Sequence, residues 1–286
     1  MEIYVVTLMP DLVRSALSHG VIGQALKDER WKLETVNPRE FTSDVHHTVD
    51  DRVFGGSDGM LMLAEPLAQS IEKVRAVSPQ TRVVHLSPRG RKFDDALARE
   101  WAAADRSLTL IASRYAGVDQ RFVDEYCDDE ISVGDFVVSG GDLPAALVID
   151  AVLRHIPGVL GNQASADNDS FSNGILEGRQ YTRPREWRGR GVPAVLTSGD
   201  PQLVSDWQFL EGLQTTLKRR HDLIEAMEKS RFTELRERVE QIKARVDREE
   251  RIWRASAPKG QDPKVTPKSQ ALHEIRELLK DLPLWR

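Results

Sequence analysis

The stretch from Ile131 to Pro144, ISVGDFVVSGGDLP, has residue types and spacing that suit a ligand-binding turn. A short apolar run, predicted to be a strand that ends near Val138, stops at Ser139-Gly140-Gly141. Asp142 then begins an apolar helical pattern. Two adjacent glycines leave no side chains at this junction, so a ligand can lie against the backbone and meet the first amides of the helix. A tight strand-to-helix turn without a ligand explains the same pattern.

A second stretch, Arg179 to Arg190 (RQYTRPREWRGR), sets five arginines among Tyr181 and Trp187. Together with Lys218, Arg219 and Arg220, these residues are the best candidates for contacts with an RNA backbone, because arginines bind phosphates and aromatic rings stack on bases. A solvated, salt-bridged face is the alternative, since acidic residues lie among the basic ones: Glu177, Glu186 and Asp222.

Several common motifs are absent from the sequence. No GxGxxG follows the first expected strand, and neither GxxxxGK[ST] nor HExxH occurs. His46 and His47 are adjacent, so their side chains are expected to point apart, which favours exposed or phosphate-contacting roles over metal binding. We therefore predict no metal ligands among the residues of this chain.

The composition of the 286 residues, 40% hydrophobic and 30% charged, is that of a soluble globular protein. The single Cys127 excludes a disulfide framework and suits a reducing compartment. The sequence shows neither a signal peptide nor an apolar run long enough to span a membrane, which predicts a cytoplasmic protein. Because the net charge is -5, a nucleic-acid partner would have to be bound by local basic patches.

The first half of the chain alternates strand and helix patterns that can position the glycine turn. Strands are expected at 3–8, 83–86 and 108–112 and helices at 65–77 and 94–104, with Asp11 as the cap of an earlier helix. Three successive strands end near Leu86, Ala112 and Val138, and each runs into a loop rich in Gly, Ser or Pro. In a parallel α/β sheet these ends lie along one edge, where ligands bind. One continuous pocket is therefore predicted.

The second half is predicted to be helical after a polar connector. Asp200-Pro201 is a cap followed by proline at the first helical position, and two long amphipathic helices follow it. A linker over 255–270 is expected to precede a short tail helix. The predicted division is residues 1–160, a connector at 161–178, a small all-helical domain at 179–254, and a linker and tail helix at 255–286.

Several blocks of the sequence resemble one family closely. The blocks are VTLMPDLV, TVDDRVFGGSDGMLM, HLSPRGRKFD, RYAGVD, SVGDFVVSGGDLPA, HIPGVLGNQASADNDSF and YTRP. In this order they resemble the bacterial tRNA (guanine-N1)-methyltransferases, the TrmD family of the SPOUT superfamily. The similarity runs from Glu2 to about Arg220, and the tail lies outside it.

The resemblance implies a SPOUT-type parallel sheet whose deep trefoil knot binds S-adenosylmethionine, and a helical C-terminal domain that binds tRNA. It also implies a homodimer and allows for magnesium. Nothing in the strand and helix pattern itself suggests a knot. The implied cofactor-binding residues come from the three loops: Leu86, Ser87, Pro88, Ser113, Tyr115, Gly117, Val133, Gly134, Phe136, Val138, Gly140, Gly141 and Pro144.

The family transfers a methyl group to N1 of the guanosine at tRNA position 37, and two residues match its catalytic positions. Asp169 matches the general base and Arg154 the partner of the substrate guanine. Guanine N1 carries a proton, so methylation needs a base and a cation that stabilises charge developing toward O6. The polar connector around Asp169 suggests a loop that orders over the target base. A solvated carboxylate or cap at Asp169, and a cation at a helix end at Arg154, are the structural alternatives.

The sequence departs from the family at three positions near the expected site. Ala116 replaces a glutamate that is associated with the target guanine, Ser113 replaces a glycine, and Asp142 replaces a glutamate. The loss at Ala116 leaves two alternatives: a SPOUT enzyme with a different RNA target, or a non-catalytic relative that binds RNA or cofactor. Retention of Asp169 and Arg154 argues against the non-catalytic relative.

Overall fold

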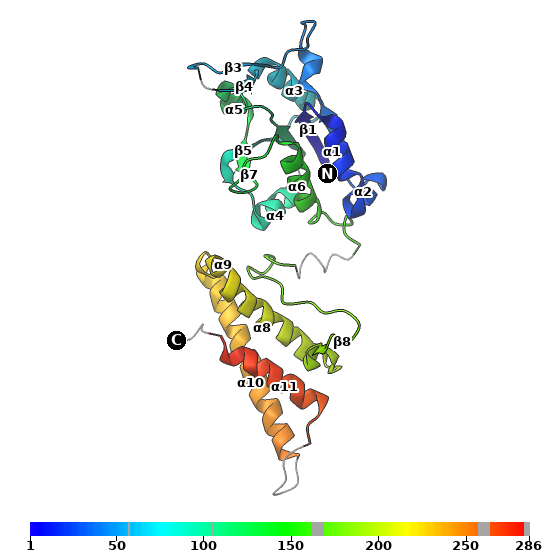
Figure 1. Ribbon diagram of the computed structural model, residues 1–286, viewed down its shortest axis with the longest axis vertical. Coiled ribbons are helices and arrows are strands. Elements are labelled where there is room, and N and C mark those ends of the chain that lie inside the picture. Colours follow the sequence, from blue (N-terminus) through cyan, green and yellow to red (C-terminus); the bar gives the residue numbers. More distant parts are fainter. Residues whose placement is uncertain (57, 105, 162–168, 257–263, 283–286) are drawn as a thin grey trace. The chain divides into compact units, whose positions relative to one another are not determined.

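The protein is described by a computed structural model that covers residues 1–56, 58–104, 106–161, 169–256 and 264–282. The chain forms two compact units, Met1–Ala166 and Asp167–Arg286 (Figure 1). Each unit contains a hydrophobic core of its own. None of the described helices has both the length and the apolar character needed to cross a membrane.

The first unit is built on a five-stranded sheet in the order β2-β1-β6-β5-β7. All of its strand pairings are parallel. The strands are β1 (Glu2–Thr7), β2 (Lys32–Val36), β5 (Arg82–Lys92), β6 (Leu108–Ala112) and β7 (Asp129–Ser132). The expected α/β class with a parallel sheet is confirmed.

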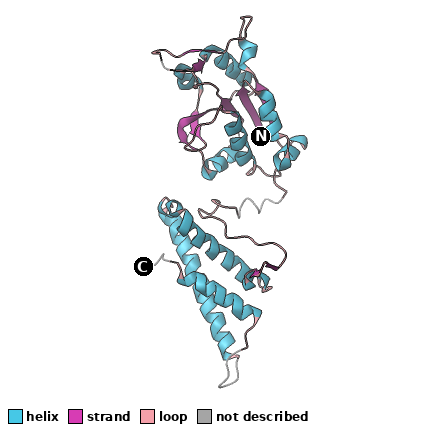
Figure 2. Cartoon of the chain, in the orientation of Figure 1, coloured by secondary structure: helices cyan, strands magenta, loops and turns pink. Residues whose placement is uncertain are grey.

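Helices cover both faces of this sheet (Figure 2), which explains why its central strands are apolar throughout. Ile3 and Val5 face a core shared with one set of helices, whereas Tyr4 and Val6 face the other set. The first set is α1 (Pro10–Leu17), α2 (Gly20–Lys27), α4 (Asp95–Ala103) and α6 (Asp142–Leu153), and the second is α3 (Ala64–Val77) and α5 (Gln120–Tyr126).

The predicted strand that ends near Val138 is wrong. β7 stops at Ser132, and Phe136, Val137 and Val138 are 56%, 82% and 45% exposed. The backbone turns at Gly134, where φ is +154°, and the carbonyl of Gly134 accepts hydrogen bonds from the Ser132 hydroxyl and the Phe136 amide. The apolar run is therefore an exposed loop and not a strand of the core.

The loop expected after Leu86 interrupts a longer strand. Both Leu86 and Arg91 pair with Ile131, so residues 87–90 bulge out of β5 before pairing resumes. Gly90 lies against the backbone of β7, where an added Cβ would meet the amide nitrogen of Ile131 at 2.3 Å. A side chain at this position would therefore push the bulge off the sheet.

One further expectation for the first unit is wrong. Asp11 does not cap α1, because the cap position is Met9 and Asp11 lies inside the first turn. The polar segment before Met60 contains a short hairpin, β3 (Asp50–Arg52) with β4 (Met60–Met62), and a 3-10 turn, η1 (Pro38–Phe41). The amide of Met62 donates to the carbonyl of Gly117, and the amide of Ala116 donates to that of Met60, so β4 supports the loop after β6.

The second unit is mainly helical, but the expectation of an all-helical domain is wrong, because a small ribbon lies at its start. The ribbon pairs β8 (Glu186–Trp187) with β9 (Arg190–Gly191) and leads into the 3-10 turn η2 (Ala194–Thr197). The helices are α8 (Pro201–Arg219), α9 (His221–Glu225), α10 (Lys229–Ala255) and α11 (Pro267–Lys280). Asp200 caps α8 by accepting hydrogen bonds from the amides of Gln202 and Leu203, which confirms that helix start.

The tail helix is longer than predicted and belongs to the core of the second unit. α11 begins at Pro267, within the expected linker, because Thr266 and Ser269 form a reciprocal capping box. Ala271, Leu272 and Ile275 are at most 1% exposed and share one core with α8 and α10.

Candidate active site

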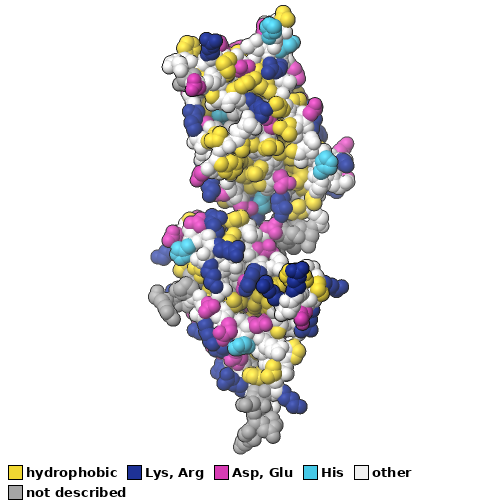
Figure 3. Space-filling view, in the orientation of Figure 1, with side chains coloured by type: hydrophobic (Ala, Val, Ile, Leu, Met, Phe, Trp, Pro, Cys, Tyr) yellow, Lys and Arg dark blue, Asp and Glu magenta, His cyan; other side chains and the backbone are white. Residues whose placement is uncertain are grey.

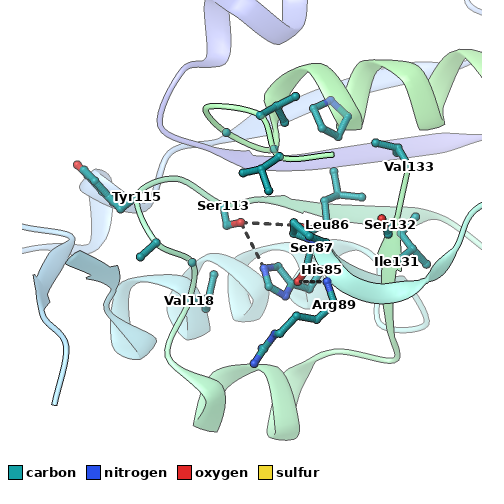
Figure 4. A pocket seen from close by; sticks show the side chains of 18 of the residues that line it. His85, Leu86, Ser87, Arg89, Ser113, Tyr115, Val118, Ile131, Ser132 and Val133 are labelled. Carbon is teal, nitrogen blue, oxygen red and sulfur yellow. Dashed lines mark hydrogen bonds between the residues drawn. The ribbon is translucent and has the colours of Figure 1, made fainter. Parts of the chain in front are cut away.

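A cavity of about 520 Å³ lies at the bulge of β5 and the carboxyl ends of β6 and β7 (Figure 4). The bulge of β5, the loop after β6 and the loop before α6 form its walls, as the strand-end pattern predicts. Each of the thirteen residues that the sequence suggests for a cofactor lines it: Leu86, Ser87, Pro88, Ser113, Tyr115, Gly117, Val133, Gly134, Phe136, Val138, Gly140, Gly141 and Pro144. That they bind a cofactor stays a prediction.

Gly140 and Gly141 have a packing role in addition to leaving room for a ligand. An added Cβ at Gly141 would lie 2.8 Å from Cα of Ala112, and the Gly141 amide donates to the carbonyl of Ser113 at 2.7 Å. An added Cβ at Gly140 would lie 2.4 Å from Cδ of Arg114. The two glycines therefore allow the loop before α6 to pack directly on the loop after β6.

A buried carboxylate joins these two loops to β1. Asp142, at the start of α6, is 1% exposed, and its Oδ1 accepts a hydrogen bond from the Thr7 hydroxyl at 2.5 Å. Its Oδ2 lies 3.3 Å from Nη1 of Arg114, which also reaches the carbonyl of Ser139. A carboxylate at a helix N-terminus beside a guanidinium is electrostatically favourable. Asp142 thus holds the walls of the cavity together.

His85 and Ser113 line the cavity and form a polar group with Glu130, and sequence reasoning missed His85 and Glu130. His85 is 3% exposed, and its Nε2 lies 3.3 Å from the Ser113 hydroxyl (Figure 4). Its Nδ1 lies 3.2 Å from Oε1 of Glu130. Burial lowers the pKa of His85, and the Glu130 carboxylate opposes this effect. When the imidazole is neutral and carries its proton on Nδ1, toward Glu130, its Nε2 accepts a hydrogen bond from the Ser113 hydroxyl.

The loop after β6 has the strained backbone expected of a binding loop. Tyr115 adopts φ +59° and is 48% exposed, and Gly117 adopts φ +128°. Ala116 lies between them, and an added Cβ at Gly59 would meet the Ala116 methyl group at 3.2 Å. Ala116, where the family resemblance leads us to expect a glutamate, lines the cavity beside Gly59.

The two residues with expected catalytic roles lie in different units. Arg154 is half-buried at the C-terminal cap of α6, and its amide donates to the carbonyl of Asp150. Asp169 opens a turn in the second unit, where its carbonyl accepts hydrogen bonds from the amide and hydroxyl of Ser172. Their side-chain roles stay predictions.

The basic stretch forms an exposed surface of the second unit (Figure 3). Trp187 is 57% exposed, and the Arg188 guanidinium lies 4.8 Å from the centre of its ring. Salt bridges account for part of the stretch, since Arg179 pairs with Glu211 and Arg220 with Asp222. Among the described residues, no carboxylate forms an ion pair with Arg183, Arg188, Arg190, Lys218 or Arg219. The salt-bridged interpretation therefore holds for Arg179 and Arg220, and RNA contact by the other basic residues stays a prediction.

The described residues contain no group of three or more His, Cys, Asp or Glu side chains arranged to hold a metal ion. His46 and His47 are exposed in the loop before β3.

Comparison with known proteins identifies the family of this chain. The family model described as tRNA (Guanine-1)-methyltransferase TrmD matches residues 1–226. Proteins named tRNA (guanine-N(1)-)-methyltransferase from Vibrio campbellii and Neisseria meningitidis serogroup C are each 46% identical over 226 residues, 79% of this chain and 91% and 90% of their own lengths. That of Shewanella oneidensis is 47% identical over 222 residues, 77% of this chain and 89% of its own length. The chain therefore belongs to the tRNA (guanine-1)-methyltransferase TrmD family.

Proposed function

We propose that this protein transfers a methyl group from S-adenosylmethionine to N1 of a guanine in tRNA, at position 37. The observation that carries the proposal is the cavity at the strand ends, whose lining contains every residue that resembles the family's cofactor-binding set. The names of the similar proteins support the reaction and the class of substrate.

The lining of the cavity fits S-adenosylmethionine. The cavity offers apolar contacts from Leu86, Val133 and Phe136, and polar groups from Ser87 and Ser113, which suits a ligand with an adenine ring, ribose hydroxyls and an amino acid. When bound, this cofactor supplies a sulfonium methyl group for displacement by a nucleophile. The strained Tyr115–Gly117 segment and the glycine turn before α6 are the parts of the chain that would hold and orient it.

We assign the proton transfer to Asp169 and charge stabilisation to Arg154. The N1 proton of guanine must leave during methylation, and a carboxylate within hydrogen-bond reach accepts it. A guanidinium toward O6 stabilises the negative charge that develops there. We infer that the segment around Asp169 orders over the target base when RNA binds, which would restrict turnover to the correct substrate.

We propose that the protein works as a homodimer with the trefoil knot of its family. The support for the knot is the family match. The support for the dimer includes an exposed apolar surface on the first unit (Figure 3), to which α6 contributes Leu143 and Leu147, 59% and 52% exposed. Apolar side chains exposed together on one helix are typical of an interface.

The basic surface of the second unit is the proposed tRNA contact. Arg183, Arg188 and Arg190 would bind phosphates, and Trp187 offers a ring on which a base can stack. We propose that the protein works in the cytoplasm, because its proposed substrate is a tRNA.

A methylation assay tests the proposal. Purified protein, S-adenosylmethionine and a tRNA transcript with guanosine at position 37 should yield 1-methylguanosine, detected by mass spectrometry of the digested RNA. The same transcript with adenosine at that position is the control and should stay unmodified. Cofactor binding by calorimetry without methylation of the transcript, at any magnesium concentration, would contradict the proposed substrate and favour a different RNA target, as Ala116 permits.

A further inference from the structure

The β8–β9 hairpin presents basic side chains without burying any of its own. Every residue from 181 to 191 is exposed, and the hairpin strands pair over two residues each. A two-stranded ribbon of this size is not stable alone in water. Its position in the second unit therefore depends on the contacts at its two ends.

The first end is anchored to α8. The Arg179 guanidinium donates to the carboxylate of Glu211, which is 2% exposed, and this contact raises the pKa of Arg179. The ring of Tyr181 lies 6.2 Å from that of Trp207. These four residues lie within the part of the chain that the family model matches.

The second end is anchored to the tail helix α11. The two carboxylate oxygens of Glu274 accept hydrogen bonds from the amides of Ala194 and Val195, at 2.8 and 2.9 Å. These amides open η2, whose first N–H groups have no partner within the turn itself. The hairpin is joined to this anchor, because the amide of Val192 donates to the carbonyl of Arg185 and the Arg185 guanidinium donates to the hydroxyl of Thr197.

Glu274 is itself held by a well-packed helix. Ile275 is fully buried in the core that α11 shares with α8 and α10. The Arg276 guanidinium pairs with both Asp247 and Glu250 of α10, at 2.6 and 2.7 Å. The carboxylate of Glu274 is therefore a fixed point to which η2 can be attached.

Glu274 and the rest of α11 lie outside the family match, which ends at residue 226, whereas Ala194 and Val195 lie inside it. We propose that α11 is a support for tRNA binding that this chain adds to the family fold, and that Glu274 is a positioning residue that fixes the exit of the basic hairpin. This inference rests on the proposed tRNA contact of the hairpin. A hairpin held in place binds RNA phosphates with less loss of conformational freedom, so the anchor raises affinity without contacting RNA itself.

Kinetic and exchange measurements on Glu274→Ala and Glu274→Gln in the full chain test the proposal. With Glu274→Ala, the KM for tRNA should rise about tenfold, the loss expected for charge-assisted hydrogen bonds. The kcat at saturating tRNA and the affinity for S-adenosylmethionine should be unchanged. Amide hydrogen exchange at 185–197 should quicken. Glu274→Gln keeps one acceptor oxygen, so its KM for tRNA should lie between those of the unsubstituted protein and Glu274→Ala.

Glu277→Ala is the matched control. Glu277 is an exposed carboxylate one turn along the same helix and pairs with the nearby Lys280, so its removal should leave the KM for tRNA unchanged. A Glu274→Ala protein with faster exchange at 185–197 but an unchanged KM for tRNA would overturn the inference, because α11 would then be structural only.

The doubly substituted Arg188→Ala, Arg190→Ala protein separates this inference from the proposed function. A weaker tRNA complex in this protein, together with unchanged binding by Glu274→Ala, overturns only the role of α11. Unchanged tRNA binding in the Arg188→Ala, Arg190→Ala protein overturns the hairpin as the RNA contact, and the inference with it. Thermal unfolding of each variant shows whether a loss of tRNA binding comes from loss of the fold.

Discussion

The hydroxyl of Thr7 donates to the buried carboxylate of Asp142 at 2.5 Å, across 135 positions of sequence. This hydrogen bond joins the end of β1 to the start of α6, beside the glycine turn that lines the cavity. The stability of the first unit and the shape of its site therefore depend on the same side chain.

Asp142→Ala should destabilise the first unit by about 3 kcal/mol, as expected when one partner of a buried charged network is removed. The Thr7 hydroxyl loses its acceptor and Arg114 its closest carboxylate. Urea unfolding measures the change. Asp150→Ala removes an exposed carboxylate from the same helix and should have little effect. Equal stabilities for the two variants would contradict the role given to Asp142.

Gly141→Ala should lower the free energy of unfolding by about 2 kcal/mol, because its methyl group would overlap backbone atoms of Ala112 and Ser113 that cannot move independently. Gly140→Ala should lower it by less, since the atoms that the new methyl group meets belong to the flexible side chain of Arg114. Gly161→Ala, in open space, is the control. Thermal unfolding of the three proteins checks this order, and a reversed order would count against the close packing of the two loops.

His85 should make the stability of the protein fall in acid. Burial places its folded-state pKa below the ordinary value of 6.5, so the unfolded chain binds more protons as pH falls. The stabilisation that comes from keeping His85 neutral is fully present above pH 6.5. It is lost progressively as the pH falls below 6.5 and through the folded-state pKa of His85. Glu130 and Arg89 are the charged groups facing the imidazole; Glu130 favours its protonation and Arg89 opposes it.

His85→Gln should reduce this pH dependence, because glutamine does not titrate. Urea unfolding between pH 5 and 8 measures the slope, to which one proton contributes at most ~1.4 kcal/mol per pH unit. His155, whose pKa is also lowered, first by burial and then by Arg99, should contribute in the same direction. The slope measured for His155→Gln is therefore the reference against which the slope of His85→Gln is compared. An unchanged slope in His85→Gln would show that His85 does not titrate in this range.

Asp169→Asn should lower the single-turnover rate of methylation by ~10²–10⁴, the range for loss of a general base, with cofactor affinity unchanged. Asparagine keeps the size of the side chain but cannot accept the proton from N1. Glu177→Gln, an exposed carboxylate in the same segment, should retain the full rate. Rapid-quench assays measure both, and a normal rate in Asp169→Asn would remove Asp169 from the mechanism.

Ala116→Glu should raise the rate on tRNA with guanosine at position 37 or deepen its dependence on magnesium, because it restores a carboxylate to the cavity wall. Ala116→Gln has nearly the same size without the charge and should give neither effect. Rates across a magnesium titration compare the three proteins. A lower rate in Ala116→Glu would show that the pocket has been refitted around alanine beside Gly59.

The sequence alone determined the class of fold and the place of the cavity. Strands β1, β5 and β6 are apolar because both faces of the sheet are covered, so they stand out without knowledge of their neighbours. Their Gly-, Ser- and Pro-rich ends predict loops, and parallel order brings those loops to one edge. The resemblance to the family supplied the individual lining residues.

Only the tertiary structure decided what the apolar run at Val133–Val138 does. Its composition matches a buried strand, but the turn at Gly134 exposes Phe136 and Val137 instead. Apolar composition favours burial but does not specify the surface against which a residue is buried. A loop whose apolar side chains line a cavity therefore resembles a strand of the core.

Tertiary structure also decided the contacts of His85 and Glu274. His85 meets Ser113 and Glu130 only because β5 lies between β6 and β7. Glu274 reaches η2 across 79 and 80 residues of sequence, although its own helix is evident from a local pattern. Periodicity and capping act within a few residues, so a sequence reveals its helices and strands. Contacts between distant polar side chains depend on how those elements pack, and local sequence does not encode them.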